Sequence, residues 1–190
     1  MKLIYLHGFA SIGNSSKSNW LRDHISDNYH FAAPDLPNKS FDAARFLDRY
    51  FTDLKGKSVG LIGTSLGGFF AAYYGAKFAW PTVLINPLAD VNDLTSHALG
   101  EYKNYYTDET FIMDQSDADC LHQMSAEMQE PSAPSLLLLD RGDDVLDYNK
   151  AIARFSQHSD MHLFENGSHR FDHLPESLPA IKALFQQGSI

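Results

Sequence analysis

Short apolar runs alternate with segments of helical periodicity along the chain. Runs rich in Val, Ile, Leu and Phe that end at a polar residue or glycine are typical of strands buried on both faces of a parallel sheet. Alternation of such strands with helices predicts a right-handed parallel sheet covered by helices on both faces, the α/β class. Ser40 is the expected N-cap of the second helix. The predicted strands are 2–6, 31–34, 59–63, 82–86, 135–140 and 161–165, and the predicted helices begin near residues 18, 41, 66, 148 and 174.

Residues 87 to about 130 depart from this pattern. They contain helical fragments near 93–99 and 117–128 and no run that predicts a strand. Ten acidic residues and one basic residue lie in this segment, which accounts for the formal net charge of −9 of the 190-residue chain. Because the segment leaves the fourth strand and returns to the fifth, we expect a small insertion that acts as a partial lid. Residues 1–190 are expected to form a single domain.

The third predicted strand runs into Gly63-Thr64-Ser65-Leu66-Gly67, and a helical pattern begins directly afterwards. A G-x-S-x-G sequence between a strand and a helix is typical of a nucleophile elbow, a strained turn that projects the serine hydroxyl above the sheet. Glycines are expected on both sides because a Cβ atom would clash where the strand and the helix cross. The alternative is a glycine-rich turn whose serine only caps the helix. The surrounding pattern favours Ser65 as a nucleophile.

A serine nucleophile needs a base within hydrogen-bond distance, and the base needs a carboxylate that holds its tautomer. Of the nine histidines, His169 lies in a turn directly after the last predicted strand. The alternatives are His162, inside that strand, and His173, further along the loop. His7 precedes the serine and is expected to shape the loop after the first strand. The sequence therefore indicates His169 as the base.

The carboxylate is expected to follow the fifth predicted strand. Asp143 is preferred because it heads an acidic and apolar stretch, and Asp144 is the alternative. Asp140 and Asp147 are expected to be solvated or to cap a helix. The resulting order of serine, aspartate and histidine along the chain is that of the α/β-hydrolase triad.

Acyl transfer also needs N–H donors for the oxyanion that forms on the carbonyl oxygen. The backbone N–H of Leu66, directly after the serine, and that of Phe9, in the loop after the first strand, are expected to supply them. His7, Tyr105 and Phe111 are further candidates for substrate contact. Apolar and aromatic residues of the insertion either line an acyl pocket or pack the insertion onto the sheet, and both readings stay open. These residues are Leu94, Leu99, Tyr102, Tyr105, Tyr106, Phe111, Ile112 and Met113.

Several stretches together resemble the small bacterial esterases of the YqiA-like family, a compact branch of the α/β-hydrolase superfamily. These stretches are residues 7–9, 63–68, 86–87, 142–148 and 167–169, and the similarity extends to 99–100 and 104–107 in the insertion. The resemblance implies a compact α/β-hydrolase fold whose six strands lie in the order 2-1-3-4-5-6. It also implies hydrolysis of a small carboxylic ester through Ser65, Asp143 and His169, without a metal or a cofactor.

Composition narrows the possible partners. A net charge of −9 argues against nucleic acids and anionic membranes, because both favour clustered Lys and Arg. Cys120 is the one cysteine of the sequence, so no internal disulfide and no cysteine zinc site is expected. The first apolar run is too short for a signal peptide, and no run approaches the length of a transmembrane helix. We expect a protein of the reducing cytoplasm without stable membrane association. The sequence predicts no oligomeric state.

Two other functions stay open beside a serine carboxylesterase. One is a thioesterase with the same triad, and the other is a non-catalytic binding module on the same scaffold. The acidic insertion argues against a coenzyme A thioester, since its carboxylates would repel a polyanion unless they face away. The absence of a Lys/Arg cluster beside the candidate loops argues in the same direction.

Overall fold

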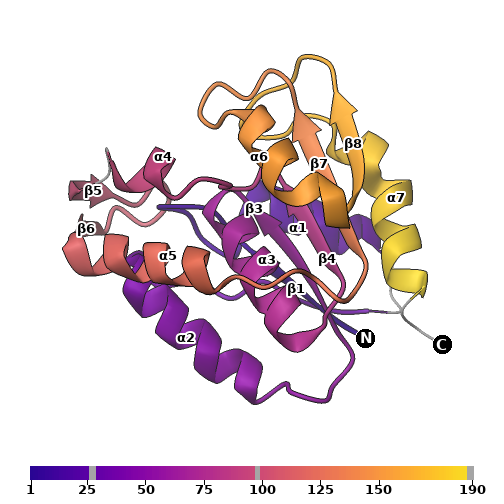
Figure 1. Ribbon diagram of the computed structural model, residues 1–190, viewed down its shortest axis with the longest axis horizontal. Helices are drawn as coiled ribbons and strands as arrows, with labels where there is room; N and C mark the ends of the chain where they lie inside the picture. Colours follow the sequence, from indigo (N-terminus) through magenta and orange to yellow (C-terminus); the bar gives the residue numbers. More distant parts are fainter. Residues whose placement is uncertain (26–28, 97–98, 188–190) are drawn as a thin grey trace.

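The computed structural model describes residues 1–25, 29–96 and 99–187 and is built around a six-stranded parallel sheet (Figure 1). The strands lie in the order β2-β1-β3-β4-β7-β8, which confirms the predicted order. Their bounds fall within two residues of those predicted from the apolar runs. The strands are β1 (Lys2–Leu6), β2 (His30–Ala32), β3 (Val59–Thr64), β4 (Thr82–Ile85), β7 (Ser135–Asp140) and β8 (Asp160–Phe164).

Alternate side chains of the central strands pack on opposite faces of the sheet. In β1, Leu3 and Tyr5 belong to one hydrophobic core, whereas Ile4 and Leu6 belong to the other. All four are at most 2% exposed. Both faces therefore need apolar side chains, which is why these strands appear in the sequence as unbroken apolar runs.

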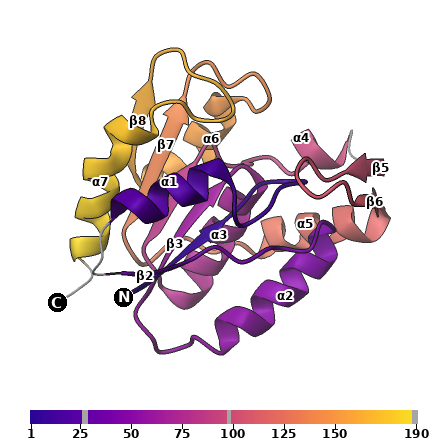
Figure 2. The ribbon, with the colours of Figure 1, turned by 180° about the vertical axis from the view of Figure 1, so that it is seen from behind.

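Helices cover both faces, as predicted, and Figures 1 and 2 show them from opposite sides. On one face lie α2 (Ser40–Thr52), α3 (Leu66–Phe78), α5 (Gln115–Glu127) and α6 (Tyr148–Phe155). On the other face lie α1 (Ser16–Ile25) and α7 (Leu174–Gln187). No helix within the described ranges is long and apolar enough to cross a membrane.

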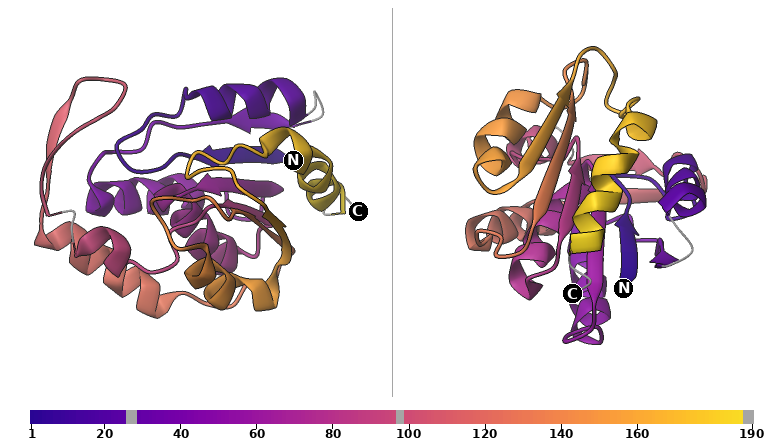
Figure 3. Two further views of the ribbon diagram at one scale, coloured as in Figure 1. Left: turned by 90° about the horizontal axis from the view of Figure 1, so that it is seen from above. Right: turned by 90° about the vertical axis from the view of Figure 1, so that its right-hand side faces the viewer.

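The segment after β4 forms a short helix, α4 (Asn92–Thr95), and an antiparallel hairpin of β5 (Gly100–Lys103) and β6 (Thr110–Met113). The expectation that this segment contains no strand was wrong. The hairpin strands are short, and in β6 buried residues alternate with exposed ones, so no apolar run marks them. Figure 3 (left) shows the hairpin at the end of the sheet away from both chain termini.

Acidic side chains of the insertion bind it to the rest of the molecule. Asp114 caps α5, completes a capping box with Asp117 and forms an ion pair with Lys39 at 2.6 Å. Asp117 is fully buried and accepts the Phe41 N–H, at the start of α2, at 2.9 Å. Ser40 was therefore wrongly expected to cap α2, since its side chain makes no capping hydrogen bond and the helix receives its acceptor from the insertion.

Candidate active site

Ser65 lies in the sharp turn between β3 and α3, at φ 55° and ψ −124°. A non-glycine residue in such a conformation costs about 1–3 kcal/mol and is typical of functional turns. The turn is tight because the backbones of β3, α3 and β1 approach one another closely at the two glycines. A Cβ atom on Gly63 would lie 2.2 Å from the Gly67 carbonyl oxygen, and one on Gly67 would lie 2.1 Å from the Leu6 carbonyl oxygen. Glycine is therefore required on both sides of the serine, as predicted.

The Ser65 hydroxyl is hydrogen-bonded to a histidine and does not cap α3. Its oxygen lies 3.1 Å from His169 Nε2, and His169 Nδ1 lies 2.9 and 3.0 Å from the two carboxylate oxygens of Asp143. Because a carboxylate can only accept, Nδ1 carries the proton and Nε2 is the acceptor for the Ser65 O–H. The loops after β3, β7 and β8 thus bring together the three residues that the sequence indicated.

Asp143 is held on several sides. Its side chain is 2% exposed, and one carboxylate oxygen accepts the N–H groups of Val145 at 2.9 Å and Leu146 at 2.8 Å. Burial by itself raises the pKa of this carboxyl, but the hydrogen bonds from His169 and Leu146 outweigh it and leave the pKa lowered. Asp144 is exposed, and the side-chain hydrogen bonds of His169 go to Asp143 and Ser65. The geometry therefore favours Asp143 over Asp144.

Two buried polar residues hold the loop that carries His169. Asn86, after β4, donates its side-chain amide to the Ser168 carbonyl oxygen at 3.0 Å and accepts the Asp140 N–H at 2.9 Å. The Asp140 carboxylate accepts His173 Nδ1–H at 2.6 Å and the Asp172 N–H at 2.8 Å. The expectation that Asp140 is solvated or caps a helix was wrong, because its side chain is fully buried.

Sequence reasoning missed the roles of Asn86 and Asp140. The available signal was their position, since each polar residue ends or follows a buried apolar strand. Asp147, in contrast, caps a helix as expected: it precedes α6, and its carboxylate accepts the Asn149 N–H at 2.9 Å.

The loop after β1 passes beside Ser65. A Cβ atom on Gly8 would lie 3.2 Å from Ser65 Cβ, so a side chain there would crowd the hydroxyl. Phe9 and Leu66 line the same cavity as Ser65. Within the described part of the chain, neither backbone N–H of these two residues donates to a protein acceptor. Both N–H groups are thus available to a bound molecule.

His7 supports this loop from behind. It is 4% exposed, its Nε2 accepts the Leu36 N–H at 2.9 Å, and its Nδ1–H therefore donates to the Gly8 carbonyl oxygen at 2.9 Å. Burial lowers the pKa of its imidazole. His7 does not line the cavity, so the expectation of substrate contact was wrong for this residue. Its place agrees with the expectation that it shapes the loop.

A cavity of about 640 Å³ opens onto Ser65 and His169. Its lining includes the apolar residues Phe9, Leu66, Leu88, Leu94, Val145 and Leu146. It also includes the polar residues Tyr5, Ser11, Ser15, Ser16, Lys17, Thr64 and Arg170. The cavity beside the serine hydroxyl is therefore lined by both apolar and polar side chains.

The insertion contributes to the cavity through some of its aromatic residues. Tyr105, which is 77% exposed, and Tyr106 line the cavity. Phe111 does not, because it is buried with its ring 5.5 Å from that of Phe9, and Tyr102 packs against Phe9 at 5.1 Å. The expectation of substrate contact at Phe111 was wrong, and this residue packs the hairpin onto the loop after β1.

The charges around the cavity differ from those expected. Of the acidic residues of the insertion, Asp93 is the one that lines the cavity within the described ranges, and it is paired with Lys150. Two cationic residues, Lys17 and Arg170, also line it. The argument against an anionic substrate holds only if carboxylates of the insertion face it, and the one that lines the cavity within the described ranges is paired.

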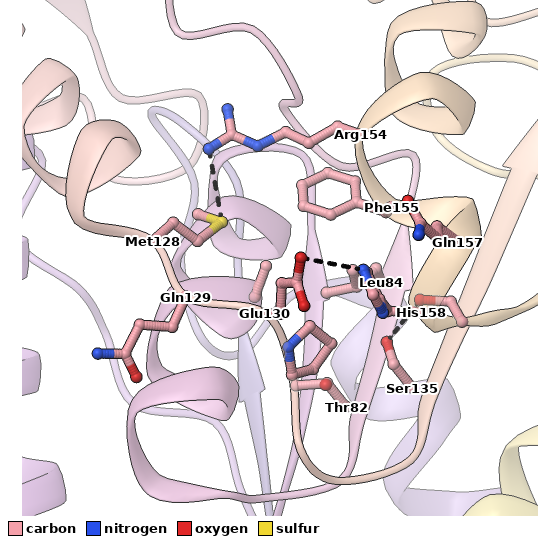
Figure 4. Close-up of a pocket in the computed structure, with 13 residues that line it drawn as sticks. Thr82, Leu84, Met128, Gln129, Glu130, Ser135, Arg154, Phe155, Gln157 and His158 are labelled. Carbon is pink, nitrogen blue, oxygen red and sulfur yellow. Dashed lines mark hydrogen bonds and ion pairs between the residues drawn. The ribbon is translucent and has the colours of Figure 1, made fainter.

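A second cavity, of about 250 Å³, lies near the amino-terminal ends of β4 and β7, and Figure 4 shows the residues that line it. Its lining includes Thr82 and Ser135, which begin β4 and β7, whereas Ser65 follows the end of β3. Its charged groups already have partners, such as Glu130 with His158 at 3.6 Å. In residues 1–25, 29–96 and 99–187 no three His, Cys, Asp or Glu side chains are grouped to hold a metal ion.

Comparisons with known proteins agree with this architecture. A family model described as "Uncharacterised protein family (UPF0227)" matches residues 2–186. A UPF0227 protein from Shewanella woodyi is 27% identical over 192 residues, which cover 98% of this chain and 99% of that protein.

Solved structures of esterases and lipases are similar in fold. Est1E from Butyrivibrio proteoclasticus has a TM-score of 0.71 at 13% identity and covers 98% of this chain and 87% of its own. A monoacylglycerol lipase from Paleococcus ferrophilus has a TM-score of 0.70 at 16% identity, with 99% and 95% covered. The esterase domain of a Rhodothermus marinus protein has a TM-score of 0.69 at 16% identity, with 98% and 85% covered. This chain has the α/β-hydrolase fold of these structures and belongs to the UPF0227 family.

Proposed function

We propose that the protein is a serine carboxylesterase that hydrolyses small acyl esters through an acyl-enzyme intermediate. The observation that carries the proposal is the hydrogen-bonded row from Ser65 Oγ through His169 to the buried Asp143. A serine hydroxyl is a weak nucleophile until a neighbouring base takes its proton. Here the base is in contact with the hydroxyl, and its protonated form would be stabilised by a carboxylate.

In the first half of the reaction, Ser65 Oγ attacks the carbonyl carbon of the ester while His169 Nε2 takes the hydroxyl proton. The negative charge that develops on the carbonyl oxygen is stabilised by the N–H groups of Phe9 and Leu66. The tetrahedral intermediate then expels the alcohol, which leaves with the proton from His169 Nε2. The product of this half is an ester between the acyl group and Ser65.

In the second half, a water molecule takes the place of the alcohol. His169 Nε2 removes a proton from the water as the oxygen attacks the acyl carbon, and the same two N–H groups stabilise the second oxyanion. Ser65 leaves with the proton from His169, and the carboxylic acid is released. Each step uses groups of this chain, the ester and water, so we expect prolonged treatment with EDTA to leave turnover unchanged.

A thioesterase is the second candidate, because the same groups would cleave a thioester carbonyl. The cavity favours keeping it, since the acidic side chain that lines it, Asp93, is paired with Lys150, and Lys17 also lines it. Rates on an ester and a thioester of one acyl group distinguish the two candidates. A binding module on the same scaffold would hydrolyse neither.

The proposal is tested by labelling with a fluorophosphonate and by hydrolysis of nitrophenyl esters of graded acyl length. We expect the wild-type protein to be labelled at Ser65 and Ser65→Ala to lower kcat by a factor of about 10⁶. A Ser65→Ala protein that stays labelled, or that keeps a few per cent of the esterase rate, would contradict the proposal.

A further inference from the structure

Lys17 extends from the first turn of α1 into the wall of the active-site cavity. Its Nζ donates to Thr64 Oγ1 at 3.2 Å, and Thr64 is the residue directly before Ser65. No carboxylate of the described residues lies within ion-pair distance of this ammonium group. A cation is thus held next to the nucleophile by a neutral hydroxyl.

Arg170 adds a second cation to the same cavity. It follows His169 directly and is exposed, and its guanidinium forms no ion pair with a carboxylate of the described chain. Some other cations of the molecule are paired with carboxylates, for example Lys39 with Asp114 at 2.6 Å and Lys77 with Asp48 at 3.0 Å. Among the described residues, Lys17 and Arg170 are the two Lys or Arg residues that line the cavity beside Ser65, and neither has a carboxylate partner.

Two carboxylates that act on Lys17 are occupied elsewhere. Asp143 binds His169, and Asp140 binds His173, so both carboxylates already have a hydrogen-bonded imidazole. Together with Asp172 they act on Lys17 through space and partly offset its burial. The lining of the cavity thus includes two cations whose hydrogen-bonding capacity is mostly unused.

We propose that Lys17 and Arg170 form an anion-binding subsite, so that the preferred ester carries a carboxylate close to its scissile carbonyl. This inference rests on the proposed esterase function and names its substrate class. The carboxylate belongs either to the acyl group or to the alcohol. In both cases the carboxylate would accept hydrogen bonds from the ammonium and the guanidinium. The apolar residues of the cavity lining would contact the remaining carbon chain.

The charge on Lys17 has a cost for folding that a substrate would relieve. Burial lowers the pKa of its ammonium to about 8, so the group is still mainly charged at neutral pH. An anion in the cavity would favour the charged form. We therefore expect Lys17→Met to raise the melting temperature of the free protein, as is common when a buried site residue without a carboxylate partner is replaced.

The first test measures discrimination between charged and neutral esters. The nitrophenyl monoester of glutarate is compared with nitrophenyl valerate, which places the charge on the acyl side. Carboxyphenyl acetate is compared with its methyl ester, which places it on the alcohol side. For one of the two pairs we expect the ratio of kcat/KM, charged over neutral, to fall about tenfold in Lys17→Met and in Arg170→Gln, the size of one lost charge-assisted hydrogen bond.

Matched controls separate the subsite from general effects of charge. Lys57→Met removes an exposed cation that precedes β3, at the far end of the strand from Ser65, and should leave both ratios unchanged. Lys17→Arg retains the charge and should restore most of the discrimination. Equal ratios in wild type, Lys17→Met and Arg170→Gln for both ester pairs, with hydrolysis still dependent on Ser65, would overturn the subsite and leave the esterase proposal intact.

The second test needs no turnover. Glutarate monomethyl ester is titrated into the Ser65→Ala protein in a calorimeter, with and without Lys17→Met or Arg170→Gln. We expect each added substitution to weaken binding about tenfold, and salt to weaken it further. Binding that depends on both cations, together with a wild-type protein that hydrolyses no ester, would contradict the esterase proposal and support the subsite. Binding that is insensitive to both substitutions would overturn the subsite.

Discussion

Two aspartate–histidine pairs lie at the carboxyl ends of β7 and β8, and by their own geometry they look alike. His169 Nδ1 lies 2.9 Å from Asp143, and His173 Nδ1 lies 2.6 Å from Asp140. The two histidine side chains are 23% and 25% exposed, and both carboxylates are almost inaccessible to solvent. A search for a carboxylate behind an imidazole would find both pairs.

The pairs differ in what surrounds them. His169 presents Nε2 to the Ser65 hydroxyl, whereas the His173 ring stacks on Phe164 at a centroid distance of 4.7 Å. Asp140 also accepts a backbone N–H from Asp172, so it acts as an anchor for the loop. An aspartate–histidine hydrogen bond therefore does not identify a base, because the role depends on what the second ring nitrogen can reach.

The largest expected contrast is between the two histidines. His169→Ala should lower kcat by about 10⁶, the scale seen when a triad loses its base. His173→Ala should change kcat by less than about tenfold, but it leaves the buried Asp140 without one partner and should cost about 1–3 kcal/mol of stability. Initial rates and thermal unfolding of the two variants, measured in parallel, check this contrast. A folded His173→Ala protein without activity would contradict a purely supporting role for His173.

The next contrast is between the two carboxylates. Asp143→Asn removes the acceptor that holds the His169 tautomer and should lower kcat by about 10⁴. Asp140→Asn should mainly lower the free energy of unfolding. It weakens the hydrogen bonds that hold the loop after β8 but leaves the hydrogen bonds among Ser65, His169 and Asp143 in place. Asp144→Asn, one residue away and exposed, is the matched control and should leave both quantities unchanged. If Asp144→Asn lowered kcat more than Asp143→Asn, the carboxylate role would pass to Asp144.

A related contrast, between a cavity-lining residue and a packing residue, occurs in the insertion. Phe111→Ala removes a buried ring packed on Phe9 and should destabilise the protein by about 3–5 kcal/mol. Tyr105→Ala should leave the melting temperature unchanged and alter the preference for acyl length by about 1–3 kcal/mol in relative kcat/KM. Nitrophenyl esters of graded length and calorimetric unfolding distinguish the two. Unchanged length preference in Tyr105→Ala would remove the hairpin from the substrate site.

The smallest expected effect is a pH dependence of stability that comes from Asp143. Its pKa is lowered in the folded state, so its contribution to stability is full above the unfolded value of about 3.9 and is lost as the pH falls below it, through the folded value. The stability difference between wild type and Asp143→Asn should therefore be present at neutral pH and shrink in acid. Denaturant unfolding at a series of pH values measures it, with Asp144→Asn as the control. A difference that grows in acid would contradict the sign.

Much of this protein is determined locally, and the sequence predicts that part well. The strands of the sheet are unbroken apolar runs because both faces are covered. The turn that carries Ser65 is recognisable from its glycines, which the close approach of the backbones requires. In the strand order that the family resemblance implies, the loops that carry Ser65, Asp143 and His169 all follow carboxyl ends of parallel strands and must meet at one end of the sheet. Fold and candidate triad were therefore both accessible before the structure was known.

What the sequence left undecided depends on distant contacts. The hairpin β5–β6 has no apolar run of its own, and it is held in place because Tyr102 and Phe111 pack against the Phe9 ring. Asp140 is buried because the loop after β8 folds over it and donates the Asp172 N–H. The approach of Lys17 and Arg170, more than a hundred residues apart in the chain, to one cavity is decided in the same way. Local patterns record which face of an element is buried. They do not record which residue of another element arrives there, and in this protein that pairing decides which charges surround the serine.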